Sequence, residues 1–162
     1  MVMLDPWSEQ DFRLLERCNT PEMTAELGGP ESPGKLADRH RKYVENAFTG
    51  KMFVIVTDDG DRAGLIGYWE HTEPTETVWE TGWAILPEFQ GRGLATAAVH
   101  AVAKVAAAAG EHSTLHAYPG VTNAASNALC RKAGFTFRAE RDFEYPKGQW
   151  MRCNDWSLDL QV

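Results

Sequence analysis

The chain has 162 residues and a formal net charge of −7. This length suits a single domain, 1–162, that can bury a core without the help of disulfides or a metal. The acidic balance argues against nucleic acid or an anionic membrane as the main partner, because each would demand a basic face.

Cysteine usage and the N-terminus indicate the compartment. Cys18, Cys130 and Cys153 are scattered and form no CxxC pair, which favours a reducing environment over a disulfide framework. The opening MVMLDPWSEQD holds no apolar run long enough for a signal peptide or a membrane span. We therefore expect a cytoplasmic protein.

The first 50 residues carry helix signals. Ser8, followed three residues later by Asp11, predicts a helix start, and the pattern runs to about Cys18. A short helix is expected after Thr20-Pro21. The pair Ser32-Pro33 predicts the start of another helix, which we expect to end near Gly50.

The pattern then changes to strands. KMFVIVTD and RAGLIGYWEH flank the turn DDGD and predict a hairpin, and TVWETGWAIL predicts a third strand. After Leu86-Pro87, apolar residues at i, i+3, i+4 and i+7 predict a helix from Leu94 that ends at Gly110.

The last third alternates strand and helix. STLHAYP predicts a strand, NAASNALCRKAG a helix ended by Gly134, and FTFRAERDFEY and QWMRCNDWSLDL two strands with a turn at Pro146-Lys147-Gly148. The fold class expected is α/β: a mixed, mostly antiparallel twisted sheet flanked by helices.

The segment AILPEFQGRGLATAAVH predicts an anion site. A strand ends, and glycines at 91 and 93 leave no Cβ in the way where a helix begins. The free N–H groups of a first helical turn and the helix dipole would hold a pyrophosphate there. A glycine-rich turn without a ligand is the plain alternative.

Two other phosphate-binding folds fit the segment poorly. A dinucleotide fold needs these glycines after its first strand and an acid about 20 residues on, whereas here about 90 residues and an antiparallel hairpin precede them. A P-loop needs Gly-Lys-Ser/Thr, which does not follow.

Two motifs in order resemble the GNAT superfamily of N-acetyltransferases. Gln/Arg-x-x-Gly-x-Gly/Ala appears as Gln90 to Ala95, and Asn-x-x-Ser with Lys-x-Gly-Phe appears at Asn123, Ser126 and 132–135. The resemblance covers about Met52 to Phe135. The flanks look like the branch of ribosomal-protein N-terminal acetyltransferases and related small-amine acetyltransferases.

The resemblance implies acetyl-CoA as cosubstrate and no metal. The pantetheine would bond the backbone of Ile85 and Leu86, and Asn123 and Ser126 would contact its thiol end. Basic side chains of Arg92, Arg131 or Lys132 could meet the outer phosphate, although exposed Arg and Lys on helices are usually only solvated. The pyrophosphate would lie on the segment of Gln90, Gly91, Arg92, Gly93, Leu94, Ala95 and Thr96.

Acetyl transfer to an amine needs a base, because an amine with pKa about 10.4 is protonated at neutral pH. Strand alternation puts Glu80 with Gly82 and Ala84 on one face. Glu80 aligns with the acidic strand residue that family members often use as base. Its plain interpretation is an exposed glutamate, and Glu70 and His71 are runners-up.

Other polar and aromatic residues carry weaker signals. His112 and His116 have i, i+4 spacing across a loop and a strand, where it does not converge on a metal. The tryptophans and tyrosines of the strands could line an acceptor pocket, although aromatics in strands are more often core.

The helix of Cys130 leaves the general acid open. Many relatives place a tyrosine where this chain has Cys130, whereas Ser126 lies one turn nearer the helix N-terminus, where a forming thiolate is favoured. A small buried hydrophobe is the default for such a cysteine. We rank Ser126 above Cys130.

The sequence therefore predicts an enzyme that moves acetyl from acetyl-CoA to a primary amine, on a small molecule or a peptide N-terminus, by direct attack in a ternary complex. The alternative is a noncatalytic acyl-CoA-binding sensor or interaction module. The amine and the oligomeric state stay open, although an exposed C-terminal strand could pair across a homodimer.

Overall fold

The computed structural model of the protein describes residues 1–144 and 147–160. One sheet carries all the strands, in the order β1-β2-β3-β4-β5-β7-β6. All neighbours are antiparallel except β4 and β5. The strands are β1 Val2–Pro6, β2 Gly50–Thr57, β3 Arg62–Thr72, β4 Thr77–Ile85, β5 Thr114–Ala117, β6 Thr136–Glu144 and β7 Trp150–Asp159.

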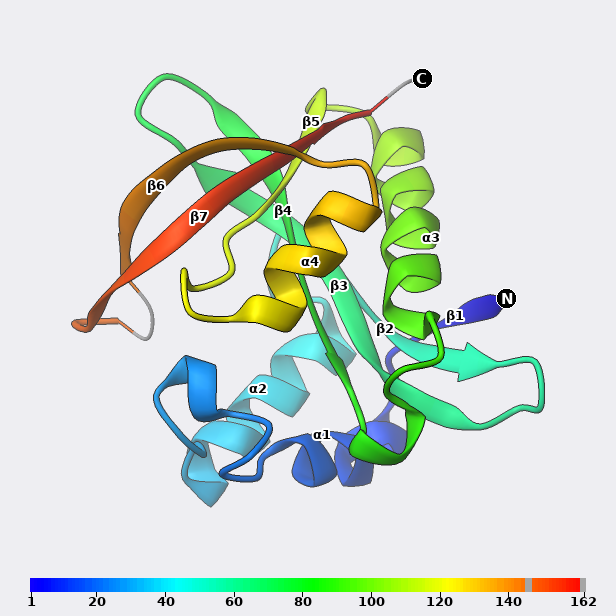
Figure 1. Cartoon of the computed structure of the whole chain (residues 1–162). Helices are drawn as coiled ribbons and strands as arrows, with labels where there is room; N and C mark the ends of the chain where they lie inside the picture. The colour runs from blue at the N-terminus through cyan, green and yellow to red at the C-terminus, as the bar shows by residue number, and fades with distance from the viewer. Residues whose placement is uncertain (145–146, 161–162) are drawn as a thin grey trace.

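Helices cover both faces of the sheet (Figure 1). The α-helices are α1 Phe12–Cys18, α2 Pro33–Glu45, α3 Leu94–Ala109 and α4 Ala124–Lys132, and the 3-10 helices are η1 Glu9–Asp11, η2 Ala25–Leu27 and η3 Pro87–Phe89. α3 and α4 pack on one face and α1 and α2 on the other. No described helix is both long and apolar enough to cross a membrane. The predicted α/β class with a mixed, mostly antiparallel sheet is confirmed.

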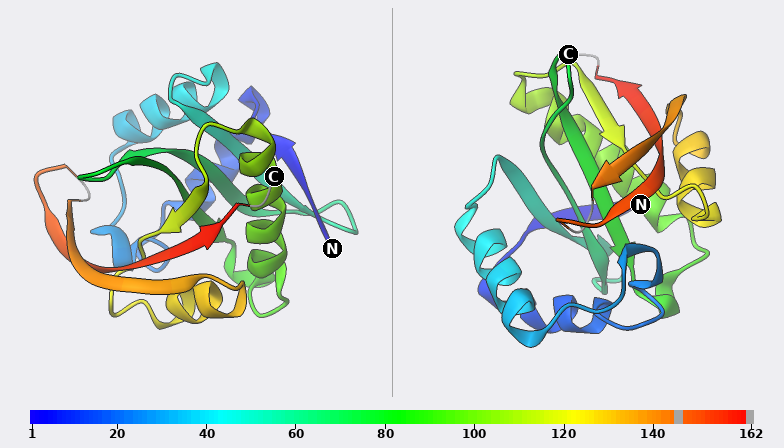
Figure 2. Two further views of the ribbon diagram at one scale, coloured as in Figure 1. Left: turned by 90° about the horizontal axis from the view of Figure 1, so that it is seen from above. Right: turned by 90° about the vertical axis from the view of Figure 1, so that its left-hand side faces the viewer.

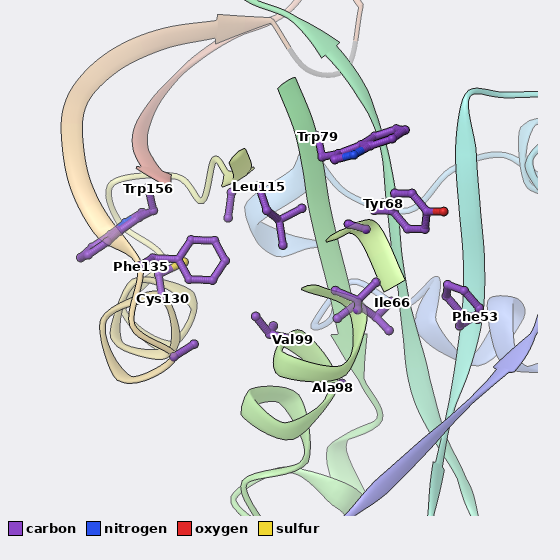
Figure 3. Close-up of a cluster of buried hydrophobic side chains, with 14 of the residues drawn as sticks. Phe53, Ile66, Tyr68, Trp79, Ala98, Val99, Leu115, Cys130, Phe135 and Trp156 are labelled. Carbon is purple, nitrogen blue, oxygen red and sulfur yellow. The ribbon is translucent and has the colours of Figure 1, made fainter. Parts of the chain in front are cut away.

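Two hydrophobic clusters fill the space between these layers. The larger lies under α3 and α4 and includes Ile66, Val99 and Leu115 (Figure 3). The smaller joins α1 and α2 to the opposite face and includes Leu14 and Val54. The predicted stripe of α3 is confirmed, because its residues Ala98, Val99, Val102 and Ala106 are buried.

The sequence missed the first strand. β1 pairs with β2 along its whole length, but it is only five residues long and contains Asp5 and Pro6. Such a strand is tolerated at a sheet edge, where a missing N–H and a charge face outward. Asp5 pairs there with Arg62 at 3.3 Å.

Two element boundaries also differ from expectation. The Ser8 signal starts a short 3-10 turn before α1, and the Asp11 carboxylate accepts a hydrogen bond from the Ser8 backbone N–H at 2.8 Å. α2 ends at Glu45 because Asn46 adopts the left-handed conformation, φ 51°. Gly50 begins β2 instead.

The C-terminal strand is not a sheet edge. β7 lies between β5 and β6, so β6 is the edge strand, and the expectation that the last strand is exposed for pairing is wrong. The homodimer itself stays a prediction. The β6–β7 hairpin and the β2–β3 turn reach to opposite sides of the molecule (Figure 2). Of the predicted turn at 146–148, Pro146 lies outside the described residues, and Gly148 has φ 86°.

Candidate active site

Strands β4 and β5 separate in the middle of the sheet. They pair only at Trp79 with Leu115 and Glu80 with His116, and beyond these residues they diverge (Figure 1). The second half of β4 therefore keeps its partner β3 on one side and has an open edge on the other. A polar ligand could add its own hydrogen bonds along that edge.

Alternation along β4 decides which backbone groups face the open edge. The Leu86 N–H donates to the Ala63 carbonyl at 2.9 Å, so this pair bonds toward β3. Along an antiparallel strand, successive residues point their backbone groups to alternate sides. The N–H and C=O groups of Thr81, Trp83 and Ile85 therefore point away from β3. The Leu86 carbonyl also accepts from Phe89 at 2.9 Å. Of the two residues expected to bond the pantetheine, Ile85 thus has its N–H at the open edge, whereas the N–H and C=O groups of Leu86 are bonded within the protein.

The glycine-rich turn lies directly after β4. Gly91 and Gly93 have φ 78° and 76°, a left-handed conformation that favours glycine, and an added Cβ at either would meet nothing within 4 Å. Packing does not demand these glycines, but a ligand lying on this surface would need the space they leave. The Gln90 side chain donates to the Ile85 carbonyl at 2.9 Å and so ties the turn to β4.

Helix α3 begins at this turn without a side-chain cap. Gly93 is its N-cap, and the first hydrogen bond within the helix runs from the Ala97 N–H to the Gly93 carbonyl. The N–H groups of Leu94, Ala95 and Thr96 are therefore not bonded within the helix. No acid lies in this first turn, so the positive end of the helix dipole is open to an anion.

The three basic candidates differ in their contacts. Arg92 donates to the Glu88 carbonyl at 3.2 Å and lies over the Phe89 ring. Arg131 lies over the Trp156 ring. Lys132 is exposed at the end of α4. Arg92 and Arg131 thus have contacts within the protein, which leaves the backbone as the main anion-binding feature.

Helix α4 follows β5 in the sequence, and its N-terminus carries the predicted residues Asn123 and Ser126. Asn123 is its N-cap, and the side-chain oxygen accepts from the Ser126 N–H at 3.2 Å. Ser126 is half-buried. Sequence reasoning overlooked Asn127, whose side chain bonds Asn154 and Trp156 and so fixes α4 against β7.

Cys130 is fully buried beside Phe135 in the larger core cluster (Figure 3). Burial raises the pKa of its thiol to about 12. Cys18 and Cys153 are also buried, and burial raises the pKa of each to about 11. The default prediction for Cys130, a small buried hydrophobe, is confirmed.

Glu80 lies on the face of β4 that carries Gly82 and Ala84, as predicted. Ala84 packs with the α1–α2 cluster, whereas Ile85 and Trp83 pack on the α3 side. The Glu80 side chain is 16% exposed. Burial raises the pKa of Glu80 to about 7, a hydrogen bond from the Trp69 indole opposes this rise, and the charge of Glu73 adds to it.

A polar cluster from five segments surrounds Glu80. Most of its side chains hydrogen-bond or pair with one another. We call it the acceptor-side cluster, and it consists of His71, Glu73, Glu80, His116, Tyr118, Arg141 and Asp155.

Three side-chain contacts hold the cluster together. Tyr118 and Arg141 both donate to the Glu73 carboxylate. Burial would raise the pKa of Glu73, but these hydrogen bonds lower it overall. The buried pair His116 and Asp155 is joined at 2.7 Å. The cluster contains one arginine, Arg141, and three carboxylates. As a whole it therefore favours the binding of a cation.

The two runner-up residues separate onto opposite faces. His71 lies between Glu80, at 3.6 Å, and Glu73, at 4.0 Å, and burial lowers its pKa so that it is neutral at pH 7. Glu70 faces the α3 side, where His112 bonds it at 2.6 Å. His112 and His116 belong to different groups of ligand-type side chains, as expected from their spacing.

Sequence reasoning missed most of the acceptor-side cluster. Glu73 looked like part of a charged turn, and its partner Arg141 and the cluster member Asp155 come from strands more than 60 residues later. The local signals were polar residues within strands, and of the cluster they identified Glu80 and, as a runner-up, His71.

A family model described as the acetyltransferase (GNAT) domain matches residues 2–136. No curated protein matches the sequence. Solved structures share the fold at low identity, as three examples show.

An acetyltransferase from Salmonella typhimurium that modifies the N-terminal serine of a 50S ribosomal subunit protein is 20% identical, with TM-score 0.79, covering 99% of this chain and 95% of that one. Spermidine N-acetyltransferase from Vibrio cholerae, with CoA and spermine bound, is 17% identical, with TM-score 0.79, covering 98% and 95%. A phosphinothricin acetyltransferase from Sinorhizobium meliloti, with AcCoA bound, is 20% identical, with TM-score 0.76, covering 98% and 88%.

Proposed function

Since the chain belongs to the acetyltransferase (GNAT) family, we propose that it moves acetyl from acetyl-CoA to a primary amine, and that Glu80 is the base. The observation that carries this proposal is the layout of β4. A buried carboxylate with a pKa of about 7 lies in the middle of the strand, and an uncapped helix N-terminus follows its end.

The cradle from Gln90 to Thr96 fits the pyrophosphate of CoA. The left-handed glycines leave the surface open, and the N–H groups of Leu94, Ala95 and Thr96 supply donors. Hydrogen bonds to charged groups contribute roughly 1.5 to 3 kcal/mol each, so a few backbone donors hold a diphosphate without a metal. The open edge of β4 then offers the Ile85 N–H to the thioester end of the pantetheine.

Glu80 accepts a proton from the acceptor ammonium, directly or through a water, and leaves a neutral nitrogen that attacks the thioester carbon. The Ile85 N–H donates to the carbonyl oxygen as negative charge develops on it. The C–S bond breaks, and Ser126 donates a hydrogen bond to the leaving sulfur near the positive end of α4. The nitrogen loses its second proton after the attack, and this proton passes to the leaving sulfur through water. CoA leaves as the thiol, the amine leaves as its acetamide, and Glu80 returns its proton to the solvent.

The buried cysteines support direct attack rather than an acyl-enzyme. A cysteine nucleophile needs an accessible thiolate with a lowered pKa. Cys18, Cys130 and Cys153 are all buried, and burial raises the pKa of each. The amine therefore attacks the thioester in a ternary complex.

A thiol-release assay with acetyl-CoA and a panel of amines tests the proposal. The panel holds a polyamine, an aminoglycoside, free amino acids and peptides with a free N-terminus. We expect at least one amine to raise CoA release well above the blank without acceptor. Tight acetyl-CoA binding with no acceptor-dependent release across the panel would instead favour the noncatalytic module.

Replacing Cys130 and Ser126 by Ala, one at a time, tests which residue of α4 contacts the thiol of CoA. Because Cys130 is fully buried, the variant is expected to lose about 1 to 2 kcal/mol of stability to a small cavity, while kcat per folded enzyme stays within about twofold. Ser126→Ala is expected to lower kcat about tenfold, the loss of one hydrogen bond to a developing charge. Urea denaturation and steady-state kinetics measure both, and a larger kcat loss in Cys130→Ala would reverse the ranking.

A further inference from the structure

Trp69 lies directly opposite Glu80 on β3. The two residues are cross-strand partners in the register of β3 and β4, and opposite residues in an antiparallel pair project from the same face. The Trp69 indole therefore lies beside Glu80, and it lowers the pKa of the Glu80 carboxyl against the effect of burial. Trp69 also packs against the α1–α2 cluster, so its ring is held by the protein core.

Gly82 makes room for the indole. It lies two residues beyond Glu80 on the same face of β4, and a Cβ added there would meet Cη2 of Trp69 at 3.0 Å and Cζ2 at 3.6 Å. The contact at 3.0 Å is tight, so a side chain at residue 82 would make the indole shift by a few tenths of an ångström. The geometry couples three positions, Trp69, Glu80 and Gly82.

We propose that Trp69 is a positioning residue for the base, in which the indole, held over Gly82, fixes the orientation of the Glu80 carboxylate. The proposal rests on the proposed function only in naming Glu80 as the base. It assigns the tryptophan to the reaction through Glu80 and not through contact with the substrate.

The need for such a donor follows from the surroundings of Glu80. Of the titratable groups that face it from the neighbouring strands and turn, Glu73 is negative, and His71, Tyr118 and Cys153 are neutral. His116, its partner on β5, is bonded to Asp155. His71 approaches at 3.6 Å but is neutral at pH 7. Arg141, the cation of the cluster, is bonded to Glu73. The indole N–H is thus the hydrogen-bond donor that keeps the buried carboxylate able to ionise near neutral pH.

The test titrates Glu80 directly. The protein is labelled with ¹³C at glutamate side-chain carboxyls, and the Glu80 signal is assigned by its absence in Glu80→Gln. The variant Trp69→Phe keeps an aromatic ring but lacks the indole N–H. We expect the pKa of Glu80 in this variant to rise by about one unit. The acidic limb of kcat/KM against pH is expected to move up by the same amount.

Trp79→Phe is the matched control. It makes the same chemical change one residue away, on the opposite face of β4, where the Trp79 indole donates to the Gly110 carbonyl at 3.1 Å. An unchanged Glu80 pKa in Trp69→Phe, or an equal rise in Trp79→Phe, would overturn the proposal.

Gly82→Ala gives a second, independent variant that keeps every polar group. The added Cβ displaces the indole, so the pKa of Glu80 is expected to rise in the same direction by a smaller amount. A Gly82→Ala protein with the wild-type Glu80 pKa would count against the coupling. Because the titration needs no substrate, absence of acetyl transfer would refute the proposed function while leaving this result to stand or fall alone.

Discussion

Replacing Glu80 by Gln is expected to lower kcat/KM at pH 7 about 100-fold, the lower end of what a general base contributes. The wild type should show an acidic limb near pH 7, because the pKa of Glu80 is raised to about 7 and only the ionised form accepts a proton. In Glu80→Gln that limb should disappear, and the residual rate should keep rising with pH toward the pKa of the free amine, about 10.4 for an alkylamine.

Glu70→Gln is the matched control for this prediction. It makes the same substitution on β3, but its side chain lies on the α3 side and is bonded to His112. We expect its kcat/KM to stay within about threefold of the wild type. A pH-rate profile of both variants with one amine acceptor decides the assignment, and wild-type activity of Glu80→Gln at pH 7 would refute Glu80 as the base.

The same substitution should act on stability in the opposite direction. Since the pKa of Glu80 is raised in the folded protein, the folded state binds more protons than the unfolded state between about pH 4.5 and 7. This group therefore favours folding below that window, and the benefit is lost as pH rises through 7. At pH 8 Glu80→Gln is expected to be more stable than the wild type, by up to about 3 kcal/mol. A loss of activity with a gain of stability would rule out unfolding as its cause.

Replacing Thr96 by Asp is expected to weaken CoA binding by about 10- to 100-fold. Thr96 lies in the first turn of α3, where no acid is present. A carboxylate there would face the pyrophosphate and repel it. The same charge interacts well with the helix dipole and should raise the stability of the free protein by about 0.3 to 1 kcal/mol.

Thr96→Asn is the control, because asparagine is neutral and has almost the same shape as aspartate. In calorimetric titration with CoA, the affinity of Thr96→Asn should stay within about threefold of the wild type. Only Thr96→Asp should show the large loss of CoA affinity. Thermal denaturation of the free proteins checks that Thr96→Asp is not the less stable variant. Equal CoA affinities for the Asp and Asn variants would mean that the pyrophosphate lies elsewhere.

The sequence predicted best where one local signal determined the structure. The stripe of α3, the DDGD hairpin and the start of a helix after glycines 91 and 93 each depend on neighbours in the chain, and each was predicted. β1 was missed because its five residues carry Asp5 and Pro6, which only its place at the sheet edge makes tolerable.

The acceptor-side cluster shows where the sequence signal ends. Glu80 was identified because an acid between apolar strand residues is unusual, but its raised pKa depends on burial by the folded sheet. The partners of Glu73 come from β6 and from the residue after β5, and no spacing in the sequence relates them. Trp69 looked like core or pocket lining, and only the strand register places it opposite Glu80. The choice between Ile85 and Leu86 as the free backbone donor needed the same register, which assigns it to Ile85.

The most direct test of the account is the initial rate of CoA release measured while acetyl-CoA and the best amine of the panel are varied together. Direct attack in a ternary complex predicts intersecting lines in double-reciprocal plots and no release of CoA before the amine is added. Parallel lines, with a burst of CoA from acetyl-CoA alone, would indicate an acyl-enzyme and contradict the mechanism.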